Sequence, residues 1–435
     1  MEISKRFSFG VALTFTAKLL MAANSVIAGV IVARLLGAES LGMFLVLNVT
    51  VQTVIQLSTF GLPMANTFYT ARDPENLVPA AMNGAVFGLT VGSGCALVVW
   101  LLSGIILPGV PADLTRLAVL AIPFQAVTIL VFNLFLARGE IKWFNFLDYL
   151  NQSFVLINCI GALVIVGGGL VILVAANAAT AIFMMMLTAI IFYRYVRRNF
   201  PVFMWRLDAS LLTTMLQYAV KGYVLWIATF LVYRLDLIIV NYFRGAAEAS
   251  VYAVASQCAL LLLLIPSTVS QVLQSKMVAQ DLRGEFTCRV ARGTSLLLAV
   301  ACLLSIPMAV LVARVYGPDF SMLPQMLWIL LPGVFFVGMQ QVLTQYFFAT
   351  GLSWRLPLSW VLTLVISLGL DLWFVPRYGA IGAAIVSTVS YSLISVATFV
   401  FFKTRTNNGL RAVLLPRPDE LGELFRSLVN QPEQG

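Results

Sequence analysis

The chain of 435 residues contains no histidine, and only 10% of its residues are charged. The lack of histidine excludes histidine-based catalysis, histidine metal ligation and a histidine pH switch. The five cysteines are scattered and show neither metal-site spacing nor a disulfide framework. No P-loop, glycine-rich nucleotide loop or paired catalytic carboxylate occurs in a polar segment. ATP-driven transport by this chain alone is therefore not expected. We therefore expect no cofactor, no metal and no enzymatic activity.

Apolar residues fill most of the chain instead. They make up 60% of the sequence, and the mean hydropathy is +0.95. A soluble domain could not cover so much apolar surface with so few charges, so a polytopic membrane protein is expected. Helices are favoured because the strands of an outer-membrane barrel alternate apolar and polar residues. The net charge of +9 lies in short segments between apolar runs, so it indicates topology and not nucleic-acid binding.

The apolar runs predict an all-α fold with twelve transmembrane helices, each long enough for the roughly 20 residues of a bilayer crossing. The predicted spans are 7–33, 41–62, 78–107, 115–137, 146–166, 170–196, 215–243, 250–273, 289–315, 322–349, 356–376 and 379–402. The weakest boundary is the Gly-Gly-Gly run 167–169. The first run follows Lys5 and Arg6 but is too long for a signal peptide, so we expect an uncleaved first span.

The basic residues test this span count. If the N-terminus is cytoplasmic, nineteen of the 27 basic residues fall in cytoplasmic segments, five in outer loops and three within spans. Cytoplasmic loops of membrane proteins carry the excess of lysine and arginine. The sequence therefore predicts a multi-pass membrane protein with both termini in the cytoplasm.

The two halves of the chain resemble each other. Ala137-Arg-Gly139 and Ala349-Thr-Gly351 are 212 residues apart, and Gly37-Ala-Glu39 resembles Gly245-Ala-Ala-Glu248. An even number of spans per repeat gives both halves one orientation, with an axis along the membrane normal and a path between them. We predict two six-helix bundles around a central cavity. Their ranges are 1–200 and 211–403, with a linker at 201–210 and a cytoplasmic tail at 404–435.

Charged residues within spans are candidates for the lining of that path. Lys18 lies ~16 Å along its helix from the cytoplasmic end, where a lone cation is costly unless it faces water or a partner. Lys18 either lines a cavity and attracts an anion, or it pairs with a buried carboxylate or snorkels toward the cytoplasmic surface. Arg234 and Asp236 lie near the middle of the seventh span. Asp236 could pair with Lys18, act as a protonatable group for ion coupling, or form a structural salt bridge.

Amides provide a second group of candidates. Asn48, Gln52 and Gln56 are spaced four residues apart, so they share one helix face and suit sugar hydroxyls or contacts between helices. Lys221 is expected to snorkel or to bind substrate. Asp371 is expected at the membrane interface. The weaker amide candidates in the eighth and tenth spans are Gln257, Gln271, Gln274, Gln341, Thr344 and Gln345.

Several short motifs, taken in order, resemble polysaccharide flippases of the multidrug/oligosaccharidyl-lipid/polysaccharide exporter superfamily. They are Ala33-Arg-Leu-Leu-Gly-Ala-Glu-Ser-Leu-Gly-Met-Phe44, Phe60-Gly-Leu62, Arg234-Leu-Asp-Leu-Ile-Ile-Val240, Val251-Tyr-Ala-Val-Ala255, Tyr316-Gly-Pro-Asp-Phe320 and Val375-Pro-Arg-Tyr-Gly-Ala-Ile-Gly-Ala-Ala384. Relatives often carry asparagine near the position of Asp371. The arginine-rich first spans of peptidoglycan-precursor flippases and the first-span acid of drug exporters are both missing.

The resemblance implies alternating access and a cationic cavity lined by the first and seventh spans, which hold Lys18 and Arg234. It implies an undecaprenyl-diphosphate-linked oligosaccharide as cargo. The cargo would be moved to the outer leaflet of a bacterial inner membrane for O-antigen, capsule or exopolysaccharide synthesis. The pathway's polymerase and glycosyltransferases would then be partners. Two alternatives stay open: an ion-coupled small-molecule exporter that uses Asp236, and an assembly platform for a polysaccharide synthase.

Overall fold

The computed structural model describes residues 2–200, 205–270, 273, 284–351 and 353–414, with the backbone alone for residues 2–14. Part of the predicted linker (201–204), the tail beyond residue 414, and the candidates Gln271 and Gln274 lie outside the described residues. Every regular element in the described part is helical.

The first half contains eight α-helices and two shorter helical turns. They are α1 (Glu2–Ser58), α2 (Leu62–Arg72), η1 (Pro74–Asn76), α3 (Leu77–Leu101), α4 (Ser103–Ile106), α5 (Ala112–Val119), α6 (Ile122–Ala137), α7 (Ile141–Cys159), the π-helical η2 (Ile160–Ile165) and α8 (Leu170–Asn199). The second half contains α9 (Ala209–Arg244), α10 (Ala246–Leu261), α12 (Gly284–Tyr316), η3 (Pro318–Phe320), α13 (Leu323–Thr350), α14 (Arg355–Thr406) and α15 (Leu410–Leu414).

These helices confirm the fold of twelve spans. Ten helical segments of the described chain are long and apolar enough to cross a membrane. Two of them, Phe15–Ser58 and Arg355–Thr406, each contain a glycine with positive φ, Gly37 at 84° and Gly379 at 61°. Only glycine adopts such a conformation readily, so each long segment turns at its glycine and supplies two spans.

Some predicted boundaries differ from the structure. The second span breaks at Phe60 and Gly61, both with positive φ, and continues beyond residue 62 as α2. The fourth span consists of α5 and α6, separated at residues 120–121. The Gly-Gly-Gly run does separate two helices, because Gly167 has a φ of 67° and α8 begins at Leu170.

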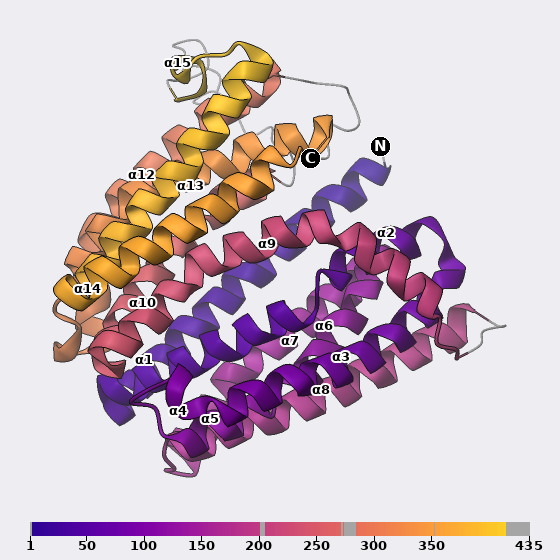
Figure 1. The fold of residues 1–435 in the computed structure, drawn as a ribbon, viewed down its shortest axis with the longest axis horizontal. Helices are drawn as coiled ribbons and strands as arrows, with labels where there is room; N and C mark the ends of the chain where they lie inside the picture. The colour runs from indigo at the N-terminus through magenta and orange to yellow at the C-terminus, as the bar shows by residue number, and fades with distance from the viewer. Residues whose placement is uncertain (1, 201–204, 271–272, 274–283, 352, 415–435) are drawn as a thin grey trace, which may run out of the picture.

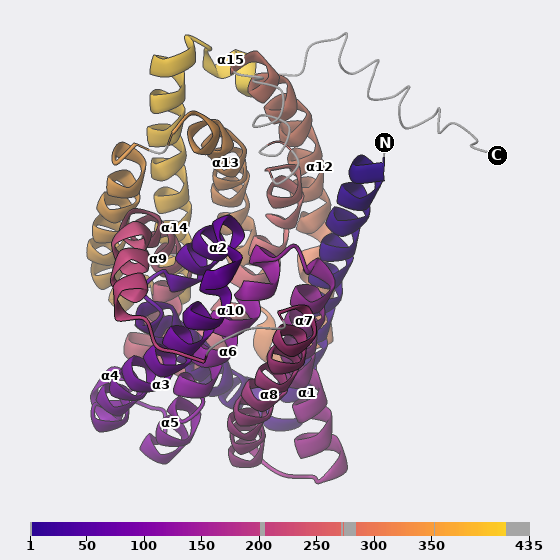
Figure 2. The ribbon, with the colours of Figure 1, turned by 90° about the vertical axis from the view of Figure 1, so that its right-hand side faces the viewer.

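The helices form two groups that meet at one end. In Figure 1, α12, α13 and α14 form one group and α3, α6 and α8 the other, with α1 and α9 between them. The groups come together at the lower left and separate toward the upper right, and Figure 2 shows the same two groups from the side. We call these the convergent end, near Gly37, Gly245 and Gly379, and the divergent end, near Arg72 and Thr406.

Backbone contact joins the two groups at the convergent end. A Cβ on Gly42 of α1 would lie 1.7 Å from the carbonyl oxygen of Ala246 at the start of α10. The guanidinium of Arg34 donates to the carbonyls of Val315 (2.8 Å) and Arg314 (2.6 Å) at the end of α12. Small residues permit such close approach, and a cation at a helix C-terminus satisfies carbonyls that lack helical partners. One apolar core runs through this end of both groups.

Helix α9 contacts both groups. Near its start, Asn83 of α3 accepts from the Asp208 backbone N–H (3.0 Å) and donates to the Asp208 carbonyl (2.7 Å). The ring of Tyr218 stacks on Phe68 of α2 with a centroid distance of 4.4 Å. Its later part packs along α14. Helix α9 therefore begins on the first group and ends within the second.

We expect Gly379→Ala to lower the free energy of unfolding by about 1–3 kcal/mol, because a side chain is strained at positive φ. Its Cβ would also lie 1.9 Å from Oε1 of Glu248. Thermal unfolding in detergent, followed by tryptophan fluorescence, measures the loss. Gly369→Ala in the same helix is the control, because nothing lies within 4 Å of its Cβ. Equal effects of the two substitutions would contradict the assigned turn.

Candidate functional site

Asp236 is held by three helices of the second half. It lies on α9 and is 4% exposed. Its Oδ2 accepts hydrogen bonds from the Tyr252 hydroxyl on α10 and from Ser387 on α14 (2.8 Å), and its Oδ1 accepts from the backbone N–H of Leu237 (2.7 Å). The hydroxyl oxygens of Tyr252 and Ser387 lie 2.9 Å apart. A buried carboxylate requires such partners, and here all of them belong to α9, α10 and α14.

The predicted alternative that Asp236 pairs with Lys18 is therefore not present. Lys18 is half-buried on α1, and its charge interacts with Asp148 on α7, in the first half. No ion pair within 4 Å joins these two described side chains. Lys18 thus has a carboxylate neighbour, as one sequence interpretation allowed, but keeps its ammonium free of a direct ion pair. Asp148 was missed, although a carboxylate inside the apolar run 146–166 was a visible signal.

Asp371 is buried among helices of the second half, which the sequence analysis did not predict. It was expected at the membrane interface, but its side chain is 2% exposed, and Oδ1 has no hydrogen-bond partner among the described residues. It lies close enough to Asp236 for the two carboxyl groups to interact. The second half therefore contains a buried pair of carboxyl groups, one well bonded and one with an unsatisfied oxygen.

Arg234 differs from its neighbour Asp236. Its side chain is half-buried, and it makes no hydrogen bond or ion pair within 4 Å with any described residue. Asp236 and Tyr391 lie near enough to interact with its charge. A guanidinium in mid-membrane without bonded partners is costly unless water or an anion reaches it. Arg234 is the strongest candidate for an anion site in the described chain.

The amide side chains of the second span differ in their hydrogen bonding. Gln56 accepts a hydrogen bond from the indole N–H of Trp226 on α9 (3.1 Å), and the Tyr223 hydroxyl donates to the carbonyl of Leu57 (3.1 Å). Gln56 therefore joins the two halves. Asn48 and Gln52 are half-buried and make no side-chain hydrogen bond with a described residue.

The other polar candidates have separate surroundings. The ammonium of Lys221 lies 5.7 Å from the centre of the Trp354 ring toward the divergent end, as a snorkelling lysine would. Gln257 donates to Ser25 of α1 (2.8 Å), which adds a contact between the halves. Gln341, Thr344 and Gln345 line a hollow with α9. The structure therefore brings no two of the predicted cations into contact.

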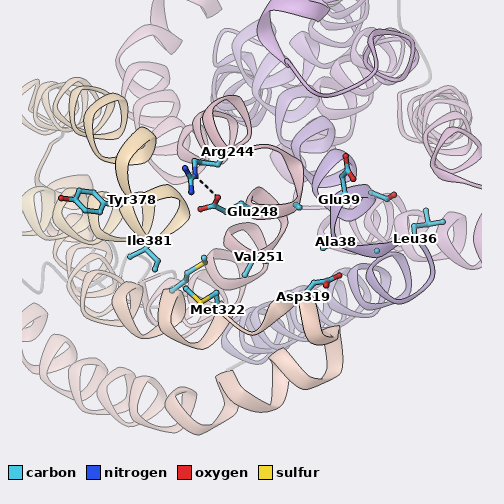
Figure 3. A pocket seen from close by; sticks show the side chains of 14 residues that line it. Leu36, Ala38, Glu39, Arg244, Glu248, Val251, Asp319, Met322, Tyr378 and Ile381 are labelled. Atoms are coloured by element: carbon cyan, nitrogen blue, oxygen red, sulfur yellow. Dashed lines mark hydrogen bonds and ion pairs between the residues drawn. The ribbon is translucent and has the colours of Figure 1, made fainter.

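A hollow of about 810 Å³ opens at the convergent end, between residues of both halves (Figure 3). Its acids are Glu39 of α1, Glu248 of α10 and Asp319 of η3. Glu248 is ion-paired with Arg244 (Nε–Oε2 3.0 Å) and accepts from the backbone N–H of Ala380 (2.7 Å). The acidic lining is unsuited to an anionic ligand, so the candidate anion path lies with Arg234 and not here.

Substitutions at neighbouring positions of α9 should separate structural from functional charge. Asp236→Ala should destabilise the protein by about 3 kcal/mol or more, because Tyr252 and Ser387 lose a buried acceptor. Arg234→Gln should change stability by less than about 1 kcal/mol, because no bonded partner is lost. Thermal unfolding of the two purified variants measures the difference. A large loss with Arg234→Gln would contradict the unpaired state of this side chain.

The sequence matches no family model and no curated protein, whereas the backbone matches solved structures. An inward-facing structure of a multidrug resistance MATE family transporter of the MOP superfamily superposes with a TM-score of 0.70, at 13% identity, covering 91% of this chain and 98% of that chain. The lipid II flippase MurJ in an inward closed conformation gives 0.70, at 14% identity, over 96% and 91%. An outward-facing MATE structure gives 0.58, at 14% identity, over 92% and 94%. The chain therefore shares its fold with these solved MATE transporter and lipid II flippase structures.

Proposed function

We propose that this protein is a flippase for a lipid-diphosphate-linked oligosaccharide, carrying undecaprenyl-diphosphate-linked repeat units to the outer leaflet for surface polysaccharide synthesis. One observation carries the proposal. Arg234 is a mid-membrane cation without a bonded partner in the described chain, within a fold of two helical bundles. Such a cation calls for an anionic cargo, and a diphosphate presents several acceptor oxygens that a guanidinium can bind in pairs.

The surrounding groups support this cargo over a hydrophobic cation. Lys18 supplies a second positive charge in the first half, and the acidic first-span residue typical of drug exporters is absent from residues 7–33. Asn48 and Gln52 carry amides without side-chain partners among the described residues, and amides can donate to and accept from sugar hydroxyls. The prenyl chain would stay in lipid, so only the polar head would enter the path.

The contacts at the convergent end support alternating access. Bonds from Arg34 to α12 and the approach of Gly42 to Ala246 hold the bundles together there, while the divergent end carries most of the basic residues. By the distribution of lysine and arginine, the divergent end would face the cytoplasm of a bacterium. Cargo would enter from that side, and the pathway's glycosyltransferases and polymerase would act before and after transport.

An ion-coupled small-molecule exporter is the second candidate. The buried carboxyl pair Asp236 and Asp371 favours it, because protonatable groups in the membrane interior commonly couple ion movement to transport. The same pair could equally power a flippase. Drug-resistance assays with an imposed proton or sodium gradient separate the two candidates. Gradient-dependent resistance together with unchanged surface polysaccharide in a deletion strain would favour the exporter.

We expect Arg234→Gln to reduce surface polysaccharide at least tenfold in a deletion strain, with the lipid-linked precursor accumulating in the cytoplasmic leaflet. The charge that binds the diphosphate is then missing, and a charge-assisted contact is worth about 1.5–3 kcal/mol. Glycan staining and leaflet-specific labelling of the lipid carrier measure the two effects. Arg377→Gln is the control, because Arg377 is exposed and lies 4.5 Å from the Trp373 ring. Full output from a normally inserted Arg234→Gln protein would overturn the assignment.

A further inference from the structure

A second hollow, of about 500 Å³, lies in the second half beside α9. Its walls come from α9, from α13 and from the serines Ser267 and Ser270 beyond α10, with Trp360 of α14 and Met64 of α2 at its edges. The volume falls within the ~300–1,000 Å³ of small-molecule sites. None of the fourteen described residues that line it has a charged side chain, so this described lining suits a neutral ligand.

Two residues that line the hollow carry buried polar atoms without a partner among the described residues. The Oε1 of Gln341 and the Oγ of Ser270 are buried and have no hydrogen-bond partner among the described residues. Gln345 donates only to the backbone carbonyl of Gln341 (3.1 Å), which leaves its Oε1 without a partner in the described chain. Leaving a buried acceptor unpaired costs about 1–3 kcal/mol, so such atoms are expected where a ligand or water completes them.

Aromatic rings lie beside these amides. Trp226 and Phe348 line the hollow and are 53% and 40% exposed, and Tyr233 and Trp360 pack edge to face at 5.9 Å. The C–H face of a pyranose ring packs against aromatic rings, while its hydroxyls require neutral donors and acceptors. Amides, hydroxyls and aromatics together therefore match a saccharide better than a lipid chain, which needs no hydrogen bonds.

The position of the hollow fits the order of groups in the proposed cargo. Tyr233 lines it and directly precedes Arg234 on α9. Arg234 itself does not line the hollow, so the proposed cargo would have its diphosphate beside the hollow and its first sugars in it. We propose that this hollow is a glycan subsite that holds the first sugars of the lipid-linked cargo. This inference rests on the flippase function proposed above and names the part of the protein that recognises the saccharide.

Photo-crosslinking in the producing cells tests the subsite with its natural ligand. The amino acid p-benzoylphenylalanine replaces Phe348, and after irradiation the purified protein is digested and analysed by mass spectrometry for saccharide-bearing peptides. Phe336 is the matched control, because it lies on the same helix and is also 40% exposed, but does not line the hollow. We expect a saccharide adduct at position 348 and none at 336. If the Phe348 variant is poorly expressed, the same replacement at Trp226 gives the same readout.

Adducts at 348 that contain only a hydrocarbon chain, or no adduct there, overturn the subsite. Equal saccharide capture at 336 overturns it as well. In the Phe348 crosslinking background, Gln341→Leu should lower the saccharide adduct about tenfold by removing one hydrogen-bonding amide. The deletion strain separates this inference from the proposed function. Loss of surface polysaccharide without capture at 348 would leave the flippase standing and reject the subsite, whereas normal polysaccharide would reject both.

Discussion

The close approach of the two bundles at the convergent end is the constraint on which the rest of the structure depends. Gly42 lies against the carbonyl of Ala246, so that no larger residue fits, and Arg34 completes the contact by bonding the last carbonyls of α12. These contacts hold the two helix groups together at the convergent end. The helices then separate toward the other end, where most basic residues are found.

The buried charges fall into two kinds. Asp236 accepts hydrogen bonds from Leu237, Tyr252 and Ser387 and joins α9, α10 and α14. Arg234, two residues earlier on the same helix, makes none with the described chain. Because residues two apart on a helix point about 200° from each other, one helix can hold a structural carboxylate and an available cation at the same depth. This division gives the second bundle both its internal bonding and its candidate anion site.

The sequence was sufficient for the fold because the signals that define it are local. Hydropathy and the alternation of basic residues predicted twelve spans, and the glycines at 37 and 379 divide helices that the chain would otherwise continue. The partners of the buried charges are not local. Whether Asp236 meets Lys18 or Tyr252, and whether Asp371 lies at the interface or in the interior, depends on how helices far apart in sequence pack. No periodicity carries that information, so Asp148, Tyr252 and Ser387 were found only in the structure.

Helix α9 adds a mechanical consequence. It is bonded to α3 near its start and packed along α14 toward its end, and an α-helix of 36 residues resists stretching. Any rocking of the bundles must keep those two attachments at a nearly fixed separation. Rotation is then easiest about a line close to α9, and displacement grows with distance from it. In such a rotation the α9 side would be the hinge. The opposite side, where α1 begins near the N-terminus, would move furthest.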